Sequence, residues 1–400
     1  MHLPIRFCFR PPIRQYAVFT KHLCVVMGLS FCLAATAAPY RPTDPNLVLE
    51  QLPRDFPQPQ AFDRGMVRDE ATELAQIQQL LDYAYLQGDP RALGQATARL
   101  QRQPAAADDV VRLMLRAQAA QANHDFAQAR QLLERVKQQQ PDNTDVHLQL
   151  ATIELVAGNF AQAQRHCEQV RSLDALVLRL TCVAQIEAMT GRLQATASKL
   201  KGIIPLLDSL TPSQQLWVLL LQADIALRLN DANLHAQVAA RLPTDNIPAL
   251  MARADWLMAQ QQWQAVYDLL RPHTQHDGLM IRWVESQRRL RQPEVARSQQ
   301  LLAERIAQWR QRDDQAHYRG QAAYALHAES AEQSLRLARQ NWLTQRETAD
   351  FVIYATAALR SQSQADIKTL LDWATLTGFE YPIVTQRLKA AQSRIQERTQ

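Results

Sequence analysis

The chain has 400 residues, of which 47% are hydrophobic, so it is long enough to bury a large core. Its 10 glycines are too few for the phosphate loops and turns of Rossmann, P-loop and barrel folds. Four of the positive charges behind its net charge of +5 lie before Ala38, so the remainder is close to neutral and shows no signature of nucleic-acid binding.

The N-terminus has the pattern of an export signal. A stretch with four basic residues and no acid precedes an apolar run over 23–35, and Ala35-Thr36-Ala37 supplies small residues for cleavage. We therefore expect residues 1–37 to be a signal peptide and the protein to reach the periplasm or be secreted. Retention of the run as an anchor and lipidation at Cys32 are the alternatives. The run is shorter than the about 20 residues of a spanning helix, so no transmembrane span is expected after signal removal.

Proline then dominates residues 38–67, which we expect to form an extended linker or arm, because proline removes backbone donors and fixes φ. From residue 68 to residue 378 the apolar residues recur with helical spacing, and no alternating run indicates a sheet. The last segment, 379–400, has a polar face and is expected to form a C-terminal capping helix, which repeat arrays need at their ends.

A short internal repeat marks the helical region. Phe126-Ala127-Gln128-Ala129 returns as Phe160-Ala161-Gln162-Ala163, 34 residues later. Upstream of the two copies, Ala151 takes the place that Ala117 has in the first unit, and Pro141 closes that unit. Small side chains at these positions allow two helices to approach to about 8–9 Å.

With this pattern the chain resembles the tetratricopeptide repeat family, whose unit is a 34-residue helix-turn-helix. The resemblance is strongest over 110–143 and 144–177. It implies an all-α fold, an α-α superhelix built as a solenoid of antiparallel helical hairpins. It also assigns the packing of the repeats to Ala117, Phe126, Ala129, Pro141, Ala151, Phe160 and Ala163.

Helix-breaking residues predict the other turns between paired helices. These turns are expected at Gly88-Asp89-Pro90, Thr190-Gly191-Arg192-Leu193, Asn230-Asp231, Gln262-Trp263, Gln292-Pro293 and Glu329-Ser330. Thr211-Pro212-Ser213-Gln214 has the pattern of a helix N-terminus.

Two cysteines remain after signal removal, Cys167 and Cys182, and they flank the turn near Leu173-Asp174 at similar distances. In an antiparallel helix pair these positions lie at the same height, so a disulfide is geometrically feasible in an oxidising compartment. Two separate buried thiols are the alternative.

Three other groups of residues could form a metal site, a charged binding surface or an aromatic groove, and each also has a purely structural explanation. His273 and His276 have the spacing of two metal ligands, but a polar loop explains them and no third ligand is near. The stretch from Arg282 to Arg312 has eight basic and three acidic residues, and either meets an acidic partner or forms a solvated helix face. Seven tryptophans could line a groove or fill gaps between hairpins. They are Trp217, Trp256, Trp263, Trp283, Trp309, Trp342 and Trp373.

The resemblance implies a scaffold that binds a protein or peptide on its concave face. It places the groove residues at Met114, Gln118, Gln121, Leu148, Thr152 and Leu155. A structural assembly factor for an envelope machine, such as a pilus, polysaccharide secretion or outer-membrane assembly, is the second hypothesis. A glycan-acting enzyme that uses Asp313-Asp314 is the third. No catalytic, metal or cofactor motif is present in the sequence, and we expect no cofactor and no enzymatic activity.

Overall fold

The computed structural model describes residues 69–102, 109–311 and 317–399. The predicted signal peptide (1–37), the proline-rich segment (38–67) and Asp313-Asp314 lie outside the described residues.

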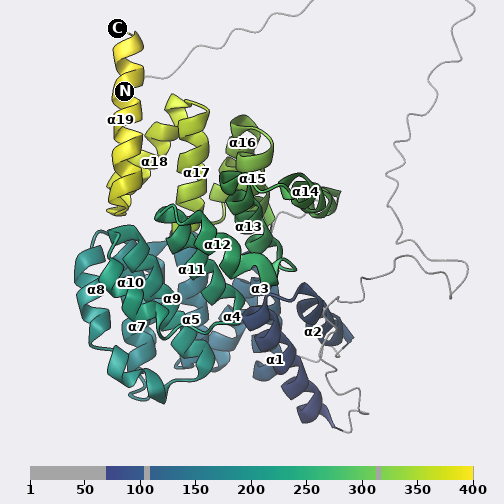
Figure 1. The fold of residues 1–400 in the computed structure, drawn as a ribbon. Coiled ribbons are helices and arrows are strands. Elements are labelled where there is room, and N and C mark those ends of the chain that lie inside the picture. The colour runs from purple at the N-terminus through teal and green to yellow at the C-terminus, as the bar shows by residue number, and fades with distance from the viewer. Residues whose placement is uncertain (1–68, 103–108, 312–316, 400) are drawn as a thin grey trace, which may run out of the picture. The chain divides into compact units, whose positions relative to one another are not determined.

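Within these ranges the regular structure is helical and contains no strand, which confirms the predicted all-α class (Figure 1). Consecutive helices pair as hairpins along the chain. The first helices of the described pairs are α1 (Glu70–Gln87), α3 (Val110–Ala122), α5 (Thr144–Val156), α7 (Leu176–Met189), α9 (Pro212–Leu229), α11 (Ile247–Ala259), α13 (Asp277–Leu290), α15 (Tyr318–Ala328) and α17 (Thr348–Arg360). The second helices are α2 (Pro90–Arg102), α4 (Phe126–Gln139), α6 (Phe160–Gln169), α8 (Leu193–Lys201), α10 (Ala232–Ala239), α12 (Trp263–Leu270), α14 (Val295–Gln311), α16 (Ala331–Trp342) and α18 (Gln364–Thr377). The single helix α19 (Pro382–Thr399) ends the chain, and η1 (Ile204–Ser209) and η2 (Arg271–His273) are short 3-10 turns.

The helix ends follow from capping chemistry in the sequence. The side chains of Asp125 and Asn143 accept hydrogen bonds from the first turns of α4 and α5, and so satisfy backbone donors that have no partner inside the helix. Thr211 and Gln214 form a reciprocal capping box before α9, with Pro212 as the first helical residue, which confirms the predicted start.

The predicted turns are also confirmed. Phe126, Phe160 and Trp263 are each the first residue of a second helix, and so are Pro90 and Leu193. The turn between α17 and α18 has no glycine or proline and was not predicted. Instead, Gln362 adopts a left-handed backbone there.

Alanines lie where the paired helices cross, as the repeat pattern predicts. Ala117, Ala129 and Ala163 are fully buried and Ala151 is 3% exposed. The surrounding leucines and valines fill the space between neighbouring hairpins, so each hairpin shares a core with the next. Pro141 is exposed in the turn after α4. Truncating one of these buried leucines would cost about 2–5 kcal/mol of folding free energy.

The first helices also contact one another along much of the array. Contacts join α5 to α7, α7 to α9, α9 to α11, and so on to α17. The free faces of these helices therefore lie on one side of the array, and the second helices lie on the other.

Glycine turns mark places where the array packs back on itself. At three turns a methyl group added to the glycine would lie within 2.5 to 3.2 Å of a residue 187 or 188 positions later in the chain. The repeated separation means that the turn of one hairpin meets the loop that follows the fifth hairpin after it. The three contacts are Gly88 with His276, Gly158 with Arg346, and Gly191 with Gly378.

A buried arginine holds the last of these contacts. The Arg228 side chain, at the end of α9, is fully buried. It donates to the carbonyl oxygens of Ala188 (2.6 Å) and Glu380 (2.9 Å) and pairs with Asp224 (3.2 Å). Its guanidinium also lies 4.4 Å from the centre of the Phe379 ring. One side chain thereby joins α7, α9 and the turn before α19, and α19 itself also contacts α9.

The helices of the described residues differ in length and in apolar composition. Among them, none combines the length and the apolar composition required to cross a membrane.

We predict that Gly378→Ala lowers the free energy of unfolding by about 2 kcal/mol, because Gly378 has a φ of +77° and its backbone touches that of Gly191. The measurement is urea unfolding followed by circular dichroism. The matched control is Gln261→Gly, at an exposed turn residue with a φ of +58°, which should change stability little or raise it. Equal effects of the two changes would contradict the proposed close packing.

Candidate functional site

The predicted groove residues lie on the first helices α3 and α5. Met114 and Leu148 are half-buried and pack against the apolar core, and Thr152 donates a hydrogen bond to the carbonyl oxygen of Leu148 (2.9 Å). Gln118 and Gln121 are also half-buried. Leu155 is only 4% exposed and belongs to the core beside the two cysteines, so we leave it out of the accessible surface.

Cys167 of α6 and Cys182 of α7 form a disulfide in the structure, with their Cα atoms 5.7 Å apart. Both residues are buried among Ala151, Leu155 and Ile186. The bond ties the second helix of one hairpin to the first helix of the next. It therefore fixes α6, which forms one wall of the site described next.

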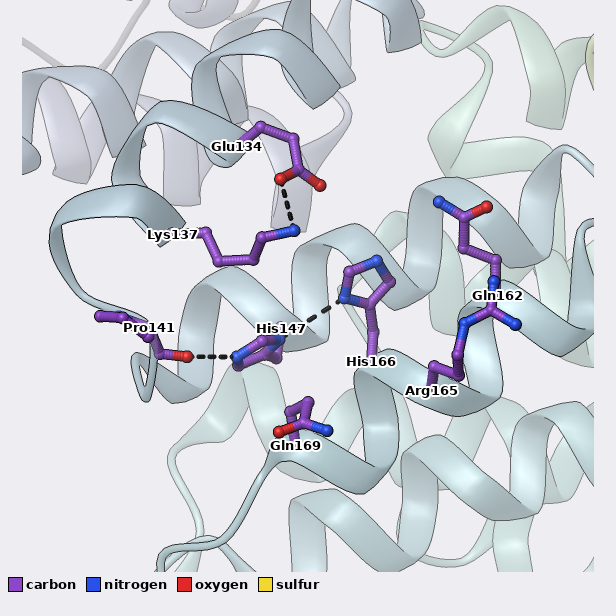
Figure 2. Close-up of a pocket in the computed structure, with 8 residues that line it drawn as sticks. All are labelled: Glu134, Lys137, Pro141, His147, Gln162, Arg165, His166 and Gln169. Carbon is purple, nitrogen blue, oxygen red and sulfur yellow. Dashed lines mark hydrogen bonds and ion pairs between the residues drawn. The ribbon is translucent and has the colours of Figure 1, made fainter.

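A polar pocket opens between the second helices α4 and α6, above the first turn of α5 (Figure 2). Its volume is about 440 Å³. It lies on the side of the second helices, away from the predicted groove. We call it the histidine pocket, and its lining residues are Glu134, Lys137, Pro141, His147, Gln162, Arg165, His166 and Gln169.

Local sequence explains how the two histidines meet. Pro141 turns the chain after α4, Asn143 caps α5, and His147 follows within the first turns of that helix. In α6, Ala163 and Cys167 face the core, and His166 lies beside them. His147 and His166 are 4% and 9% exposed, so both rings are set into the wall and are not free on the surface.

The ring nitrogens form a short chain of contacts. Nε2 of His147 lies 2.7 Å from the carbonyl oxygen of Pro141, and Nδ1 of His147 lies 3.5 Å from Nδ1 of His166. Burial lowers the pKa of His166, and the positive charge of Lys137 and the neighbouring His147 lower it further. Burial therefore favours the neutral form of the His166 ring.

The charges on the pocket wall are unequal. Lys137 pairs with Glu134 one turn earlier on α4, whereas Arg165 makes no ion pair with any described residue. Gln162 and Gln169 add amide groups from α6. The pocket therefore carries about one net positive charge at neutral pH and can bind an anion.

The other sequence candidates have structural roles. The ring of His276 packs against Gly88 and Gly278, and His273 lies in η2. In the described ranges there is no group of three or more His, Cys, Asp or Glu residues placed to hold a metal ion. The basic stretch from Arg282 is partly neutralised, because Arg282 pairs with Asp255 (2.7 Å).

The tryptophans mostly fill space between helices. Trp256, Trp309 and Trp342 are each 7% exposed, and Trp342 contacts Trp373 with ring centres 5.0 Å apart. The remaining three are half-buried: Trp217 and Trp283 pack against core clusters, and Trp263 lies under a guanidinium. The gap-filling explanation therefore fits these residues better than a tryptophan-lined groove.

The buried carboxylates of the described residues are engaged in ion pairs. Burial raises the pKa of Asp366, but hydrogen bonds from Arg339, Ser363 and Tyr354 outweigh this effect and lower it to about 2. Such a group stays ionised and does not act as a general acid near pH 7. The other buried carboxylates among the described residues are Glu154, Glu187, Glu285 and Asp350, and each accepts from an arginine or lysine.

Sequence reasoning did not find the histidine pocket. The two histidines are 19 positions apart and belong to no known spacing motif, so only the packing of three helices reveals them. It also missed three exposed leucines around the start of α7, Leu173, Leu176 and Leu180, which are 86%, 46% and 44% exposed.

Residues 120–176 match the sequence model of the tetratricopeptide repeat family. This segment is a tetratricopeptide repeat region. It contains α4, α5 and α6 completely, together with all the residues that line the histidine pocket. Tetratricopeptide repeats present extended surfaces of the kind that suit interactions with other proteins. No curated protein matches the chain.

We predict that replacing both Cys167 and Cys182 with Ala lowers the free energy of unfolding by about 3 kcal/mol, because the bond closes a loop with a sequence separation of 15. Urea unfolding measures the change, and the double variant is compared with the oxidised protein. Thiol counting under denaturing, non-reducing conditions should find no free thiol in the protein produced without residues 1–37. Two free thiols per chain would rule out the bond.

We also predict that acid destabilises the protein partly through His166. Burial lowers the pKa of His166 below its usual value of 6.5, so the unfolded chain takes up a proton before the folded chain does. Stability should therefore fall as the pH drops through 6.5 and below. His166→Gln should reduce this fall in unfolding midpoints measured from pH 7.5 to pH 5, whereas His273→Gln should not. A slope unchanged by His166→Gln would contradict the prediction.

Proposed function

We propose that the protein is a non-enzymatic protein-interaction scaffold of the bacterial envelope that binds a peptide or partner protein on the concave side lined by its first helices. The observation that carries this proposal is the tetratricopeptide repeat region over 120–176, set within hairpins that continue on both sides. In that region and just before it, the first helices α3 and α5 leave Gln118, Gln121 and Thr152 partly accessible. These side chains offer hydrogen bonds and little charge, so the surface suits a neutral or mixed segment.

The envelope location rests on the sequence. A cleavable signal at residues 1–37 would deliver the chain to an oxidising compartment, where the pairing of Cys167 with Cys182 would be stable. The disulfide geometry supports this location. Loss of the signal should retain the protein inside the cell with both thiols reduced.

An assembly factor for an envelope machine is the second candidate. The exposed leucines Leu173, Leu176 and Leu180 favour it, because apolar side chains in contact with water are suited to a stable protein contact. The two functions differ in the partners they recruit. A single stable complex indicates assembly, and many weak ligands indicate general peptide binding.

We predict that a photo-crosslinking amino acid at Gln118 or Gln121 captures a partner protein in intact cells, because both positions lie on the proposed binding face. The matched control replaces Gln194, an exposed glutamine on the second helix α8, outside the histidine pocket. Mass spectrometry of the crosslinked bands identifies the partner and counts how many there are. Capture at Gln194 but not at Gln118 and Gln121 would reject the concave side as the binding face.

A further inference from the structure

The hydrogen bonds of the histidine pocket fix which nitrogen atoms carry protons. The carbonyl oxygen of Pro141 can only accept, so Nε2 of His147 carries a hydrogen and donates it to that oxygen at 2.7 Å. Nδ1 of His147 is then an acceptor. Nδ1 of His166, at 3.5 Å, must therefore be the donor of that long contact.

This arrangement leaves Nε2 of His166 as a proton acceptor. It has no partner among the described residues, and Figure 2 shows this ring nitrogen directed away from His147. A proton added at this atom leaves the contacts of His147 with Pro141 and with Nδ1 of His166 unchanged. Protonation therefore turns an acceptor on the pocket wall into a charged donor.

The surrounding charges restrain this protonation without preventing it. Lys137 on α4 and His147 on α5 oppose the positive charge on His166, and Glu134 on α4 and Glu154 on α5 favour it. Glu154 is itself held by Arg130 at 2.6 Å. On the neighbouring helix α7, Cys182 is bonded to Cys167 and contributes no charge.

We propose that the histidine pocket is a carboxylate subsite that receives an acidic side chain of a partner protein, and that protonation of His166 strengthens this binding. The proposal rests on the scaffold function proposed above and adds a second, outer contact to it. Arg165 supplies the guanidinium, which pairs in plane with a carboxylate. The amides of Gln162 and Gln169 and the Nε2–H of protonated His166 supply further donors.

The charge balance favours a carboxylate over a phosphate group. Glu134 lines the same pocket and repels a dianion more strongly than a monoanion. Arg165 is the free cation at neutral pH, since Lys137 is already paired with Glu134. A volume of about 440 Å³ admits a glutamate side chain and part of the peptide that carries it. Binding should therefore be weak at neutral pH and tighter as His166 gains its proton.

The test is the binding of a fluorescein-labelled, C-terminally amidated hexaglutamate peptide to the purified protein, followed by fluorescence anisotropy at pH 7.5 and pH 5.5. The glutamate side chains stay ionised over this range, since their pKa is about 4.3. We expect the Kd to fall at least about threefold on acidification, and Arg165→Gln to raise it about fivefold at both pH values. His166→Gln should remove the pH dependence while leaving binding at pH 7.5.

The control variants are Arg179→Gln, which removes an exposed arginine from α7, and His273→Gln, which removes a histidine outside the pocket. Both should bind like the unmodified protein at each pH. A hexaglutamine peptide with a free C-terminus tests whether a terminal carboxylate suffices, and inorganic phosphate serves as a competitor. Tighter binding of either than of hexaglutamate would overturn the assigned ligand.

Two further outcomes would overturn the proposal. Absence of hexaglutamate binding at both pH values would reject the subsite, and equal effects of Arg165→Gln and Arg179→Gln would show that the peptide binds by overall charge. Neither outcome bears on the proposed scaffold function, because crosslinking at Gln118 and Gln121 tests that function separately. If a partner is captured at these positions and hexaglutamate does not bind, the scaffold proposal stands and only the carboxylate subsite is rejected.

Discussion

The arrangement of the array depends on the hydrogen bonds that the buried guanidinium of Arg228 donates. This guanidinium is buried without a fully buried acid beside it, and it is satisfied instead by two carbonyl oxygens from helix ends that are far apart in the chain. Removal of this side chain would leave those carbonyls without a donor in the interior, which is costly. The side-chain carboxylate of Glu380 caps α8, because its Oε1 accepts a hydrogen bond from the N–H of Leu193 at 3.1 Å. The turn before α19 thus completes a helix that has no capping side chain of its own.

The hairpins could be predicted from sequence because their signals are local. Capping residues, prolines and the alanine-rich crossings act within about one 34-residue unit, and the turns at Phe126, Phe160 and Trp263 followed from them. The contacts between Gly158 and Arg346 and between Gly191 and Gly378 could not be predicted in this way. They depend on the small rotation that each hairpin adds to the one before, and that rotation comes from packing throughout the core. A glycine at a turn indicates a left-handed backbone, but it does not indicate which residue packs against that turn.

The site was predictable only in part, for a related reason. The distances of the two cysteines to one turn made a disulfide feasible without deciding against two free thiols, and the groove positions stay a prediction of the repeat resemblance. The histidine pocket has no such signal, because His147 and His166 meet through the register of α4, α5 and α6. Position in the repeat also does not settle accessibility: Leu155 fits the groove pattern and is nevertheless buried beside the disulfide. A pocket on the side of the second helices and a binding face on the first helices would let one region hold a partner from two directions.

The constant separation of the contacting turns has a consequence for how such a chain can change in length. Many solenoids gain or lose units freely, since each unit touches only its neighbours. Here the turn of one hairpin is matched to a loop five hairpins later. Deletion or duplication of a unit between them would bring the wrong surfaces together, placing a bulky turn such as the one at Arg291 where a glycine is needed. The packing of these turns against the later loops therefore fixes the number of units between them. Evolution of this array should proceed by substitution within units or by addition of units at its ends.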